Sequence, residues 1–275
     1  LRLYDTTGIG LFFMVKVINW NPREKLFKSN RVFKIKGLKR VNNFGDLIGP
    51  LIVEKVLELN ATISSRRSIF SRRLLTVGSI LHFAKNGDTV WGTGRNGKIS
   101  CELHKFSELD VRAVRGPLTR EFLQQKGINC PEVYGDPALL LPTLFKELKT
   151  KSKEKSYELT IVPNLNDLDL FDKYTQNVIN PCGNFYSIIE RIAKSEFVVG
   201  SSLHAIVVAE SLGIPARLIE GRSEPSFKYE DYYLGTGRAS YKAVRTVMSA
   251  IEMGGEEKMK FDSDKLLNCF PFDIY

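Results

Sequence analysis

The sequence is short of the features that mark secreted, membrane-spanning or zinc-binding proteins. Its four cysteines lie far apart and form no C-x-x-C pair, which fits neither a zinc site nor a disulfide-dense secreted scaffold. No apolar run approaches the ~20 residues that a helix needs to cross a bilayer, and the run at residues 9–15 lacks the cleavage pattern of a signal peptide. We therefore expect reduced thiols and a cytoplasmic protein. Met14 followed by V-K-V-I-N-W is typical of a natural start, so residues 1–13 are not used to predict the fold.

The composition is that of a soluble globular protein with an excess of positive charge. The 275 residues are 43% hydrophobic and 26% charged, enough for one large domain or two modest ones with a substantial core. The formal net charge of +9 predicts an anionic partner: a phosphorylated substrate, an anionic membrane surface or nucleic acid. Nucleic acid is disfavoured because the basic residues show no aromatic interleaving and no helix-turn-helix, zinc-finger or RNP pattern. The cluster Arg66, Arg67, Arg72 and Arg73 either contacts anionic headgroups at the inner face of the cell membrane or is a solvated face.

Strand and helix patterns alternate along the chain, without an internal repeat or a low-complexity tract. Short apolar runs predict strands at residues 15–20, 74–78, 89–92, 109–114, 159–163, 197–199 and 216–219. Helical patterns fall at residues 41–57, 117–126, 185–194, 203–212 and 241–253. The basic segment 23–40 lacks periodicity and is expected to be a loop. The charged stretch Lys146–Lys155 is expected to be a linker. We predict an α/β protein with domains at 14–148 and 149–275, whose last helix can pack back on the first domain.

The most informative stretch is residues 196–216, which predicts a buried strand, a tight turn at Gly200 and an apolar helix with His204 in its first turn. The free N–H groups and partial positive charge of a helix start attract anions, and the hydroxyls of Ser201 and Ser202 add donors. The helix dipole disfavours the cationic form of His204 in an empty site. A bound dianion would favour the protonated, cationic form of His204, which could then act as a general acid. A capped core helix with a hydrogen-bonded histidine is an equally weighted alternative.

Further polar side chains stand near predicted strand ends and helix starts. Asn43 and Asp46 lie at the entry of the helix predicted at 41–57. Asp46 is there either an acidic cap or, with Asn43, part of a pair that faces a cleft and binds sugar hydroxyls. The glycine-rich loop 92–97 has neither Walker nor dinucleotide spacing. His82 lies at a strand end, where α/β proteins place ligands, although a structural role is favoured.

Charged residues in three other segments are candidates for substrate binding. Arg115 is predicted at a junction between a strand and a helix that begins at Pro117, and an arginine there can fork onto a carboxylate or phosphate. Asp136 lies in a Y-G-D-P turn ahead of an apolar segment. The polar and aromatic segment 222–237 either closes over a ligand or is a surface loop with aromatic anchors; it contains Lys228, Tyr229, Asp231 and Tyr232.

Seven motifs, in order and with sensible spacing, make the chain similar to the polysaccharide pyruvyltransferase family, and within it to the exopolysaccharide and lipopolysaccharide ketal-pyruvyl branch. They are N-N-F-G-D (42–46), G-S-I-L-H (78–82), V-W-G-T-G (90–94), V-R-G-P-L-T-R (114–120), Y-G-D-P-A-L-L-L-P (134–142), G-S-S-L-H-A-I-V-V-A-E-S-L-G-I-P (200–215) and F-K-Y-E-D-Y-Y (227–233). The resemblance implies a GT-B-like architecture, in which two Rossmann-type domains face each other across a cleft.

The resemblance also implies an activity: transfer of a pyruvyl group from phosphoenolpyruvate onto two hydroxyls of a sugar, which forms a cyclic ketal and releases phosphate. The acceptor in such enzymes is typically a hexose or N-acetylhexosamine of a cell-surface glycan or its lipid-linked precursor. The family's S-x-[R/S]-L-H-[A/G] motif falls on residues 200–205, so His204 matches the family histidine. One common form of the family has arginine where this chain has Ser202. Its role would pass here to Arg115, Arg95, Arg222 or Lys228.

The expected chemistry assigns roles without a metal or a cofactor, because phosphoenolpyruvate is itself the donor substrate. His204 is the expected acid that protonates the methylene carbon. Asp46 or Asp136 is the expected base for the sugar hydroxyl. The expected substrate-binding residues are Asn43, Ser79, Arg95, Arg115, Gly200, Ser201, Ser202, Lys228 and Asp231. The alternatives are a GT-B glycosyltransferase that uses a nucleotide sugar, and a non-catalytic glycan- or polyanion-binding protein.

Overall fold

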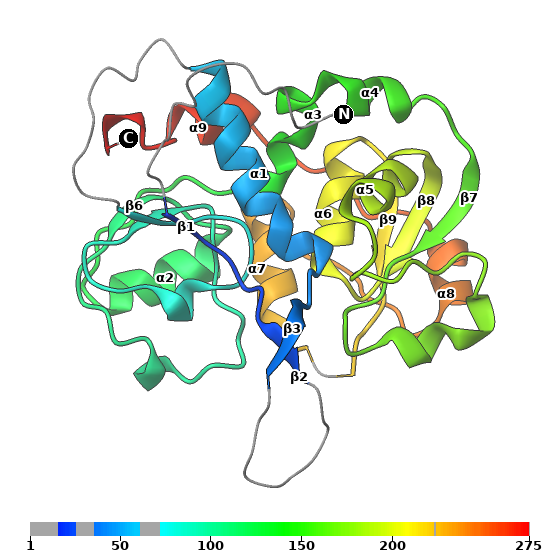
Figure 1. Cartoon of the computed structure of the whole chain (residues 1–275), viewed down its shortest axis with the longest axis horizontal. Helices are drawn as coiled ribbons and strands as arrows, with labels where there is room; N and C mark the ends of the chain where they lie inside the picture. The colour runs from blue at the N-terminus through cyan, green and yellow to red at the C-terminus, as the bar shows by residue number, and fades with distance from the viewer. Residues whose placement is uncertain (1–15, 26–35, 61–71, 223, 275) are drawn as a thin grey trace, which may run out of the picture.

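Two parallel β-sheets organise the part of the chain that the structure describes (Figure 1). The computed structural model describes residues 16–25, 36–60, 72–222 and 224–274, and within these ranges the fold class is α/β. The first sheet has the order β1-β4-β5-β6, with β1 (Lys16–Ile18), β4 (Arg73–Leu75), β5 (Thr89–Trp91) and β6 (Asp110–Ala113). The second has the order β7-β8-β9, with β7 (Tyr157–Ile161), β8 (Ser195–Gly200) and β9 (Ala216–Leu218). Their strand pairs are parallel, as alternating strand and helix patterns predict.

Helices cover the two sheets and fill the space between them. In the described residues they are α1 (Phe44–Leu59), α2 (Pro117–Gln125), α3 (Leu141–Leu144), α4 (Lys146–Lys151), α5 (Phe185–Ala193), α6 (Leu203–Ser211), α7 (Phe227–Gly235), α8 (Val247–Met253) and α9 (Ser263–Asn268). None of these helices is both long enough and apolar enough to span a membrane. In Figure 1, α1 and α7 lie between the two sheets. The predicted turn chemistry is present at α6, where Ser202 is the N-cap residue and Gly213 has a positive φ of 73° after the last turn.

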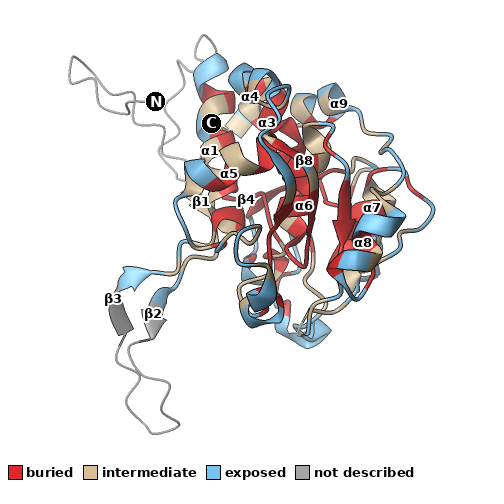
Figure 2. Cartoon of the chain, turned by 90° about the vertical axis from the view of Figure 1, so that its right-hand side faces the viewer, coloured by how far each residue is buried: buried red, intermediate tan, exposed pale blue. Residues whose placement is uncertain are grey.

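One hydrophobic cluster joins the two sheets. Phe44, Ile48 and Ile52 on one face of α1 are fully buried and belong to the same cluster as Ile206 and Val207 of α6. Figure 2 shows α6 and β8 among the most buried elements. Burying one such side chain contributes roughly 1.5–3 kcal/mol relative to leaving it in water. The contact between the two halves is therefore part of the core, which fixes how the strand ends of one sheet face those of the other.

The basic segment 23–40 differs from the loop expected there. Its described residues form two antiparallel strands, β2 (Arg23–Lys25) and β3 (Lys36–Arg40). Antiparallel pairing satisfies backbone groups whatever the side chains are, so it requires no apolar periodicity. Of the other sequence-based expectations, those on residues 1–15 and on Arg66 and Arg67 lie outside the described residues.

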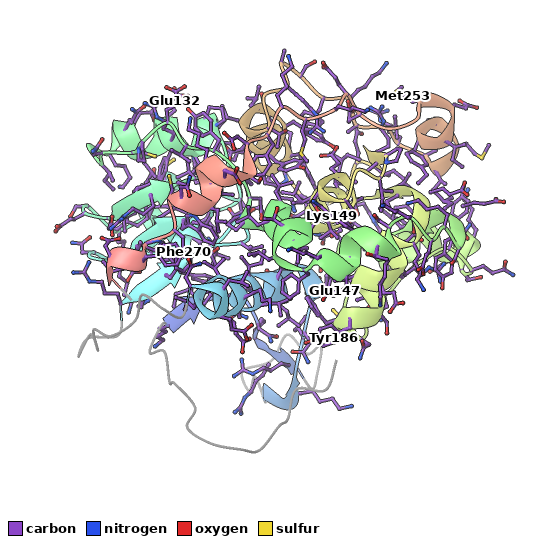
Figure 3. The ribbon with its side chains drawn as sticks, turned by 90° about the horizontal axis from the view of Figure 1, so that it is seen from above. Glu132, Glu147, Lys149, Tyr186, Met253 and Phe270 are labelled. Carbon is purple, nitrogen blue, oxygen red and sulfur yellow. The ribbon has the colours of Figure 1, made fainter. Side chains whose placement is uncertain are left out.

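The linker expected at residues 146–155 is in part the helix α4. Glu147 and Lys149 are exposed on it (Figure 3), whereas Leu148 packs against the main core and Lys151 pairs with Glu190 of α5. Lysine, glutamate and leucine are good helix formers, so a charged stretch with one well-placed apolar residue becomes a helix once there is a surface for it to cover.

The segment 222–237, expected either to close over a ligand or to be a surface loop with aromatic anchors, is not a surface loop. It contains α7, whose buried residues include Lys228, Tyr229, Asp231 and Tyr232. This helix packs against α2, and the approach is so close that a Cβ on Gly116 would collide with the backbone oxygen of Asp231. A helix from the second half of the sequence is therefore built into the first half.

The C-terminal region also packs against the first sheet. Trp91 of β5 donates its indole N–H to the carbonyl of Leu266 at 3.0 Å, and Phe270, labelled in Figure 3, lies edge-on against the Trp91 ring. The helix predicted at 241–253 begins only at Val247, because residues before it are used otherwise: Val244 forms a bridge with Ile219 beside the second sheet.

Candidate active site

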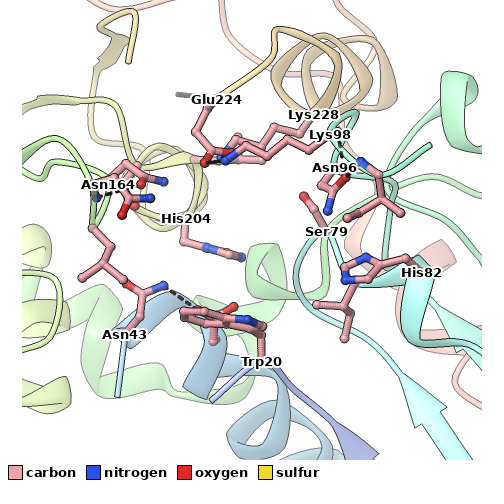
Figure 4. A pocket seen from close by; sticks show the side chains of 17 residues that line it. Trp20, Asn43, Ser79, His82, Asn96, Lys98, Asn164, His204, Glu224 and Lys228 are labelled. Atoms are coloured by element: carbon pink, nitrogen blue, oxygen red, sulfur yellow. Dashed lines mark hydrogen bonds and ion pairs between the residues drawn. The ribbon is translucent and has the colours of Figure 1, made fainter. Parts of the chain in front are cut away.

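A cavity of about 350 Å³ lies where the carboxyl ends of the two sheets meet (Figure 4). Parallel α/β sheets place ligands at this end of their strands. The loop after β4 contributes Ser79, Ile80 and His82, the loop after β5 Asn96, Lys98 and Ile99, the loop after β7 residues 164–166, and the start of α6 residues 202–204. The remaining lining residues come from the end of β1, the start of α1 and the region of α7: Trp20, Asn43, Asp46, Glu224 and Lys228.

His204 lies on the cavity wall in the first turn of α6. Its ring is partly exposed, but Nε2 itself is buried and has no hydrogen-bond partner among the described residues. The Nδ1 side packs against Gly45 so closely that a Cβ there would collide with the ring. Burial, and then the charges of Lys228 and Arg115, lower the pKa of His204 from 6.5 to about 3. The imidazole is therefore neutral in the empty cavity, and only an anion close to it can restore its proton at neutral pH.

Asp46 and Asn43 form a pair on the same cavity. The Asn43 amide donates to Asp46 Oδ2 at 2.5 Å, and neither side chain caps α1, since the Asn43 N-cap makes no side-chain cap bond. Burial raises the pKa of Asp46 from 3.8 to about 6, although the Asn43 hydrogen bond and the charge of Lys228 oppose that rise. A Cβ on Gly78 would lie 3.9 Å from His204 Nε2 and 4.0 Å from Asp46 Oδ1. The acid candidate and the base candidate therefore border one small volume.

Two lysines and a glutamate form a charged cluster at another part of the wall. Lys228 Nζ lies 2.7 Å from Glu224 Oε2, and Lys98 pairs with Glu224 Oε1. Burial alone would raise the pKa of Glu224, but Lys228 and Lys98 outweigh it and lower the pKa. The pKa of Lys228 is lowered by burial despite the opposing charge of Glu224.

Arg115 stands behind the cavity wall and does not line it. The side chain is fully buried, and its Nη2 lies 2.9 Å from Asp231 Oδ2. It also donates to Ser79 Oγ at 2.5 Å and to the Arg95 carbonyl at 2.6 Å. Asp231 receives further hydrogen bonds from the backbone and hydroxyl of Thr119. Because a buried charge needs a counter-ion, the charge of Arg115 is neutralised by Asp231. Arg115 contacts the cavity lining through its hydrogen bond to Ser79.

The other arginines considered for the donor also lie outside the lining. Arg95 stacks its guanidinium on the rings of Phe122 and Phe227, 4.2 and 4.8 Å from their centroids. Arg222 is half exposed and pairs with Asp169. Within the described residues, the lysines of the charged cluster are therefore the cations that line the cavity directly.

Three more of the sequence-predicted residues are used by the fold near the site. Gly200 ends β8 with a φ of 150°, where a Cβ would collide with the carbonyl of Val162. Ser201 is buried and donates to Asp167 at 2.7 Å. Asp136 is fully buried outside the lining, where it caps a short 3-10 turn by accepting from the Ala138 N–H at 3.0 Å. Burial raises the pKa of Asp136 to about 6.

Sequence reasoning missed several lining residues and undervalued one. His82, expected to be structural, lines the cavity, and its Nδ1 is buried without a partner among the described residues. Signals for others were present: Glu224 stands four residues before Lys228, and N-L-N at 164–166 follows a predicted strand. The residues missed are Trp20, Asn96, Lys98, Asn164, Asn166 and Glu224.

Fold and cavity together define an α/β protein with a site at the strand ends, in which two lysines line the wall and a neutral histidine lies beside a carboxyl group. The family model described as polysaccharide pyruvyl transferase matches residues 103–223. The resemblance to polysaccharide pyruvyltransferases found in the motifs is thereby confirmed over residues 103–223.

Two relatives extend the comparison beyond the matched region. Succinoglycan biosynthesis protein ExoV of Rhizobium meliloti (strain 1021) is 28% identical over 198 residues, which cover 66% of this chain and 60% of that protein. The chain thus spans less than two thirds of that relative's length. An uncharacterized protein of Acanthamoeba polyphaga mimivirus is 25% identical over 223 residues, covering 75% of this chain and 76% of that protein.

Proposed function

We propose that the chain is a ketal pyruvyltransferase, which transfers the pyruvyl group of phosphoenolpyruvate onto two hydroxyls of a sugar in a cell-surface polysaccharide or its lipid-linked precursor. The observation that carries the proposal is the pairing of His204 and Asp46. An unpartnered imidazole nitrogen and a carboxyl group with a pKa of about 6 border one volume of the cavity. The match of residues 103–223 to the polysaccharide pyruvyl transferase family and the similarity to ExoV, a succinoglycan biosynthesis protein, support the same function.

Donor binding in this proposal begins with charge. Phosphoenolpyruvate carries a carboxylate and a phosphate, and the start of α6 offers N–H groups, a partial positive charge and the Ser202 hydroxyl to them. Arg115 acts from behind the wall by orienting the Ser79 hydroxyl. A donor anion beside His204 opposes the desolvation that keeps the imidazole neutral, so the substrate raises the pKa of its own acid catalyst.

The transfer then needs one addition and one substitution at the central carbon of the donor. His204 gives its proton to the methylene carbon, which becomes the methyl group and leaves the central carbon electrophilic. A sugar hydroxyl attacks that carbon while Asp46, positioned by Asn43, takes the hydroxyl proton. The second hydroxyl attacks the same carbon, the bond to phosphate breaks, and the phosphate leaves with the remaining proton. One ketal and one phosphate are formed, and no oxidant or reductant is required.

The proposal includes a GT-B-like arrangement, with residues 14–148 as the acceptor-side domain and 149–275 as the donor-side domain. The two separate parallel sheets and a cavity lined by both halves support it. Trp20, a partly exposed ring on the cavity, is suited to stack on the face of a sugar. We propose a cytoplasmic location.

The test is a phosphate-release assay with phosphoenolpyruvate and a panel of aryl and lipid-linked hexosides. We expect acceptor-dependent phosphate release, with the methyl group of the ketal visible by NMR. His204→Gln keeps the size of the side chain and should remove most of the activity, whereas the surface variant Glu58→Gln should not. Protection by a nucleotide diphosphate sugar together with indifference to phosphoenolpyruvate would favour a glycosyltransferase instead. Salt-sensitive binding of polyanions without phosphate release would favour a non-catalytic binding protein.

A further inference from the structure

Glu224 occupies a position on the cavity wall that an anionic ligand would be expected to take. Its two carboxylate oxygens each pair with a different lysine: Oε1 with Lys98 and Oε2 with Lys228. Figure 4 shows the ends of both lysine side chains meeting this carboxylate. Two ammonium groups on the two oxygens of one anion make the arrangement with which proteins bind a carboxylate or a phosphate.

The two lysines come from different halves of the molecule. Lys98 lies in the loop after β5, and Lys228 lies in the first turn of α7. The Glu224 and Lys228 side chains are only 9% and 10% exposed, while that of Lys98 is 37% exposed. The two lysines are therefore part of the cavity wall. Burial holds the side chain of Lys228 in place, whereas the more exposed side chain of Lys98 can adjust to a ligand.

The charged cluster of Lys98, Lys228 and Glu224 can accommodate an anion of higher charge than a carboxylate. Two lysines face one carboxylate, so the cluster has a net positive charge, and the buried Arg115 is already neutralised by Asp231. Glu224 stays ionised, since the lysines lower its pKa, so it acts as an anion here and is unsuited to be the acid of the reaction. A phosphate dianion would pair with the same two lysines and leave less of their charge uncompensated.

We propose that Lys98 and Lys228 form the anion subsite for the donor and that Glu224 is a built-in occupant, which the donor's phosphate or carboxylate displaces. Identifying the ligand as the donor rests on the proposed function; the subsite itself rests on the geometry. The lysines remain paired throughout, so the buried Lys228 is never left without a counter-ion. Anions that compete poorly with a carboxylate are thereby excluded.

Calorimetric binding of inorganic phosphate and of phosphoenolpyruvate tests this exchange. Glu224→Gln removes the competing charge and should tighten the binding of both ligands about tenfold, the size of one charge-assisted hydrogen bond. Lys98→Met should weaken binding by a similar factor. In the double variant Lys98→Met/Glu224→Gln the gain should be largely lost, because the released lysine is what provides it. Glu58→Gln is the matched control: it breaks an exposed lysine pair with Lys55 outside the cavity and should leave both affinities unchanged.

The outcome that overturns the proposal is a Glu224→Gln protein that binds phosphate no more tightly than the unaltered chain. A purely structural role predicts that result, together with lower stability. If Glu224→Gln does not fold, Lys98→Met decides the matter, since its side chain is partly exposed, and unchanged affinities would refute the subsite. Phosphate release from phosphoenolpyruvate with unaltered affinities in both variants refutes the subsite and leaves the pyruvyltransferase function standing. The expected affinity shifts without phosphate release on any acceptor refute that function and support the subsite.

Discussion

Replacing Asp46 by asparagine is expected to make the protein more stable and inactive at the same time. Burial raises the pKa of Asp46 from 3.8 to about 6. Above pH 6 the side chain is charged in the folded state although burial disfavours the charge, and this lowers the free energy of unfolding. That rise corresponds to at most about 3 kcal/mol at 25 °C. Asparagine is nearly isosteric and can still accept the hydrogen bond from Asn43, so most of this cost should be removed.

The sign of the pH dependence makes the prediction sharp. The folded pKa of Asp46 lies above the unfolded value, so the unfolded state loses its proton first as the pH rises from 4 to 6. The stability gain of Asp46→Asn should therefore be close to zero at pH 4, grow towards pH 6 and stay constant above it. Urea unfolding of both proteins at several pH values measures it.

Asp169→Asn is the control for this experiment. The hydrogen bond from Arg222 lowers the pKa of Asp169 at the surface from 3.8, so its charged form stabilises the fold; the variant should be the less stable protein above that pH, by an amount that no longer changes between pH 5 and 8. A gain for Asp46→Asn that does not change with pH, or a loss of stability at pH 8, would show that Asp46 is not held in a desolvated site. The base role assigned to it would then lose its support.

Four further outcomes are expected. His204→Ala should lower kcat by about 100-fold or more, the contribution of a positioned acid, and near-normal turnover would rule that role out. The kcat/KM of the unaltered enzyme should rise with pH through about 6 as Asp46 ionises, and this limb should vanish in Asp46→Asn. Arg115→Met should lower the free energy of unfolding by about 3–5 kcal/mol because Asp231 is left buried without its partner; thermal unfolding measures this, and adding Asp231→Leu should restore part of the loss. Acceptor sugars should quench the fluorescence of Trp20 and not that of the fully buried Trp91, so quenching that survives Trp20→Phe would contradict the stacking role.

The predictions that held depend on local chemistry. The strand, turn and helix around His204 follow from a short apolar run, glycines at both ends of the helix and a proline after it, and each of these acts within a few residues. The parallel sheets followed from the alternation of strands and helices. His204, Asn43 and Asp46, which were singled out at predicted helix starts, line the cavity, while the roles assigned to them stay predictions.

The failures share a cause: the partner of a side chain can be far away in the sequence. The polar and aromatic composition of segment 222–237 predicted that it either closes over a ligand or is a surface loop with aromatic anchors. In the structure Asp231 neutralises an arginine 116 residues earlier, and this contact makes α7 a buried helix. The hairpin at β2 and β3 was missed because backbone pairing leaves no mark in the side-chain pattern.

The sequence by itself determined the elements, their alternation and the histidine at a helix start, since each of these depends on neighbours along the chain. Only the tertiary structure decided which cation meets the cavity. In the sequence, Arg115 and Lys228 are equally good candidates to bind an anion. In the structure Arg115 pairs with the buried Asp231. Lys228 and Lys98 instead both pair with Glu224 on the cavity wall. The physical reason is that a buried charge must be paired, and the choice of its partner is made by packing and not by order in the chain.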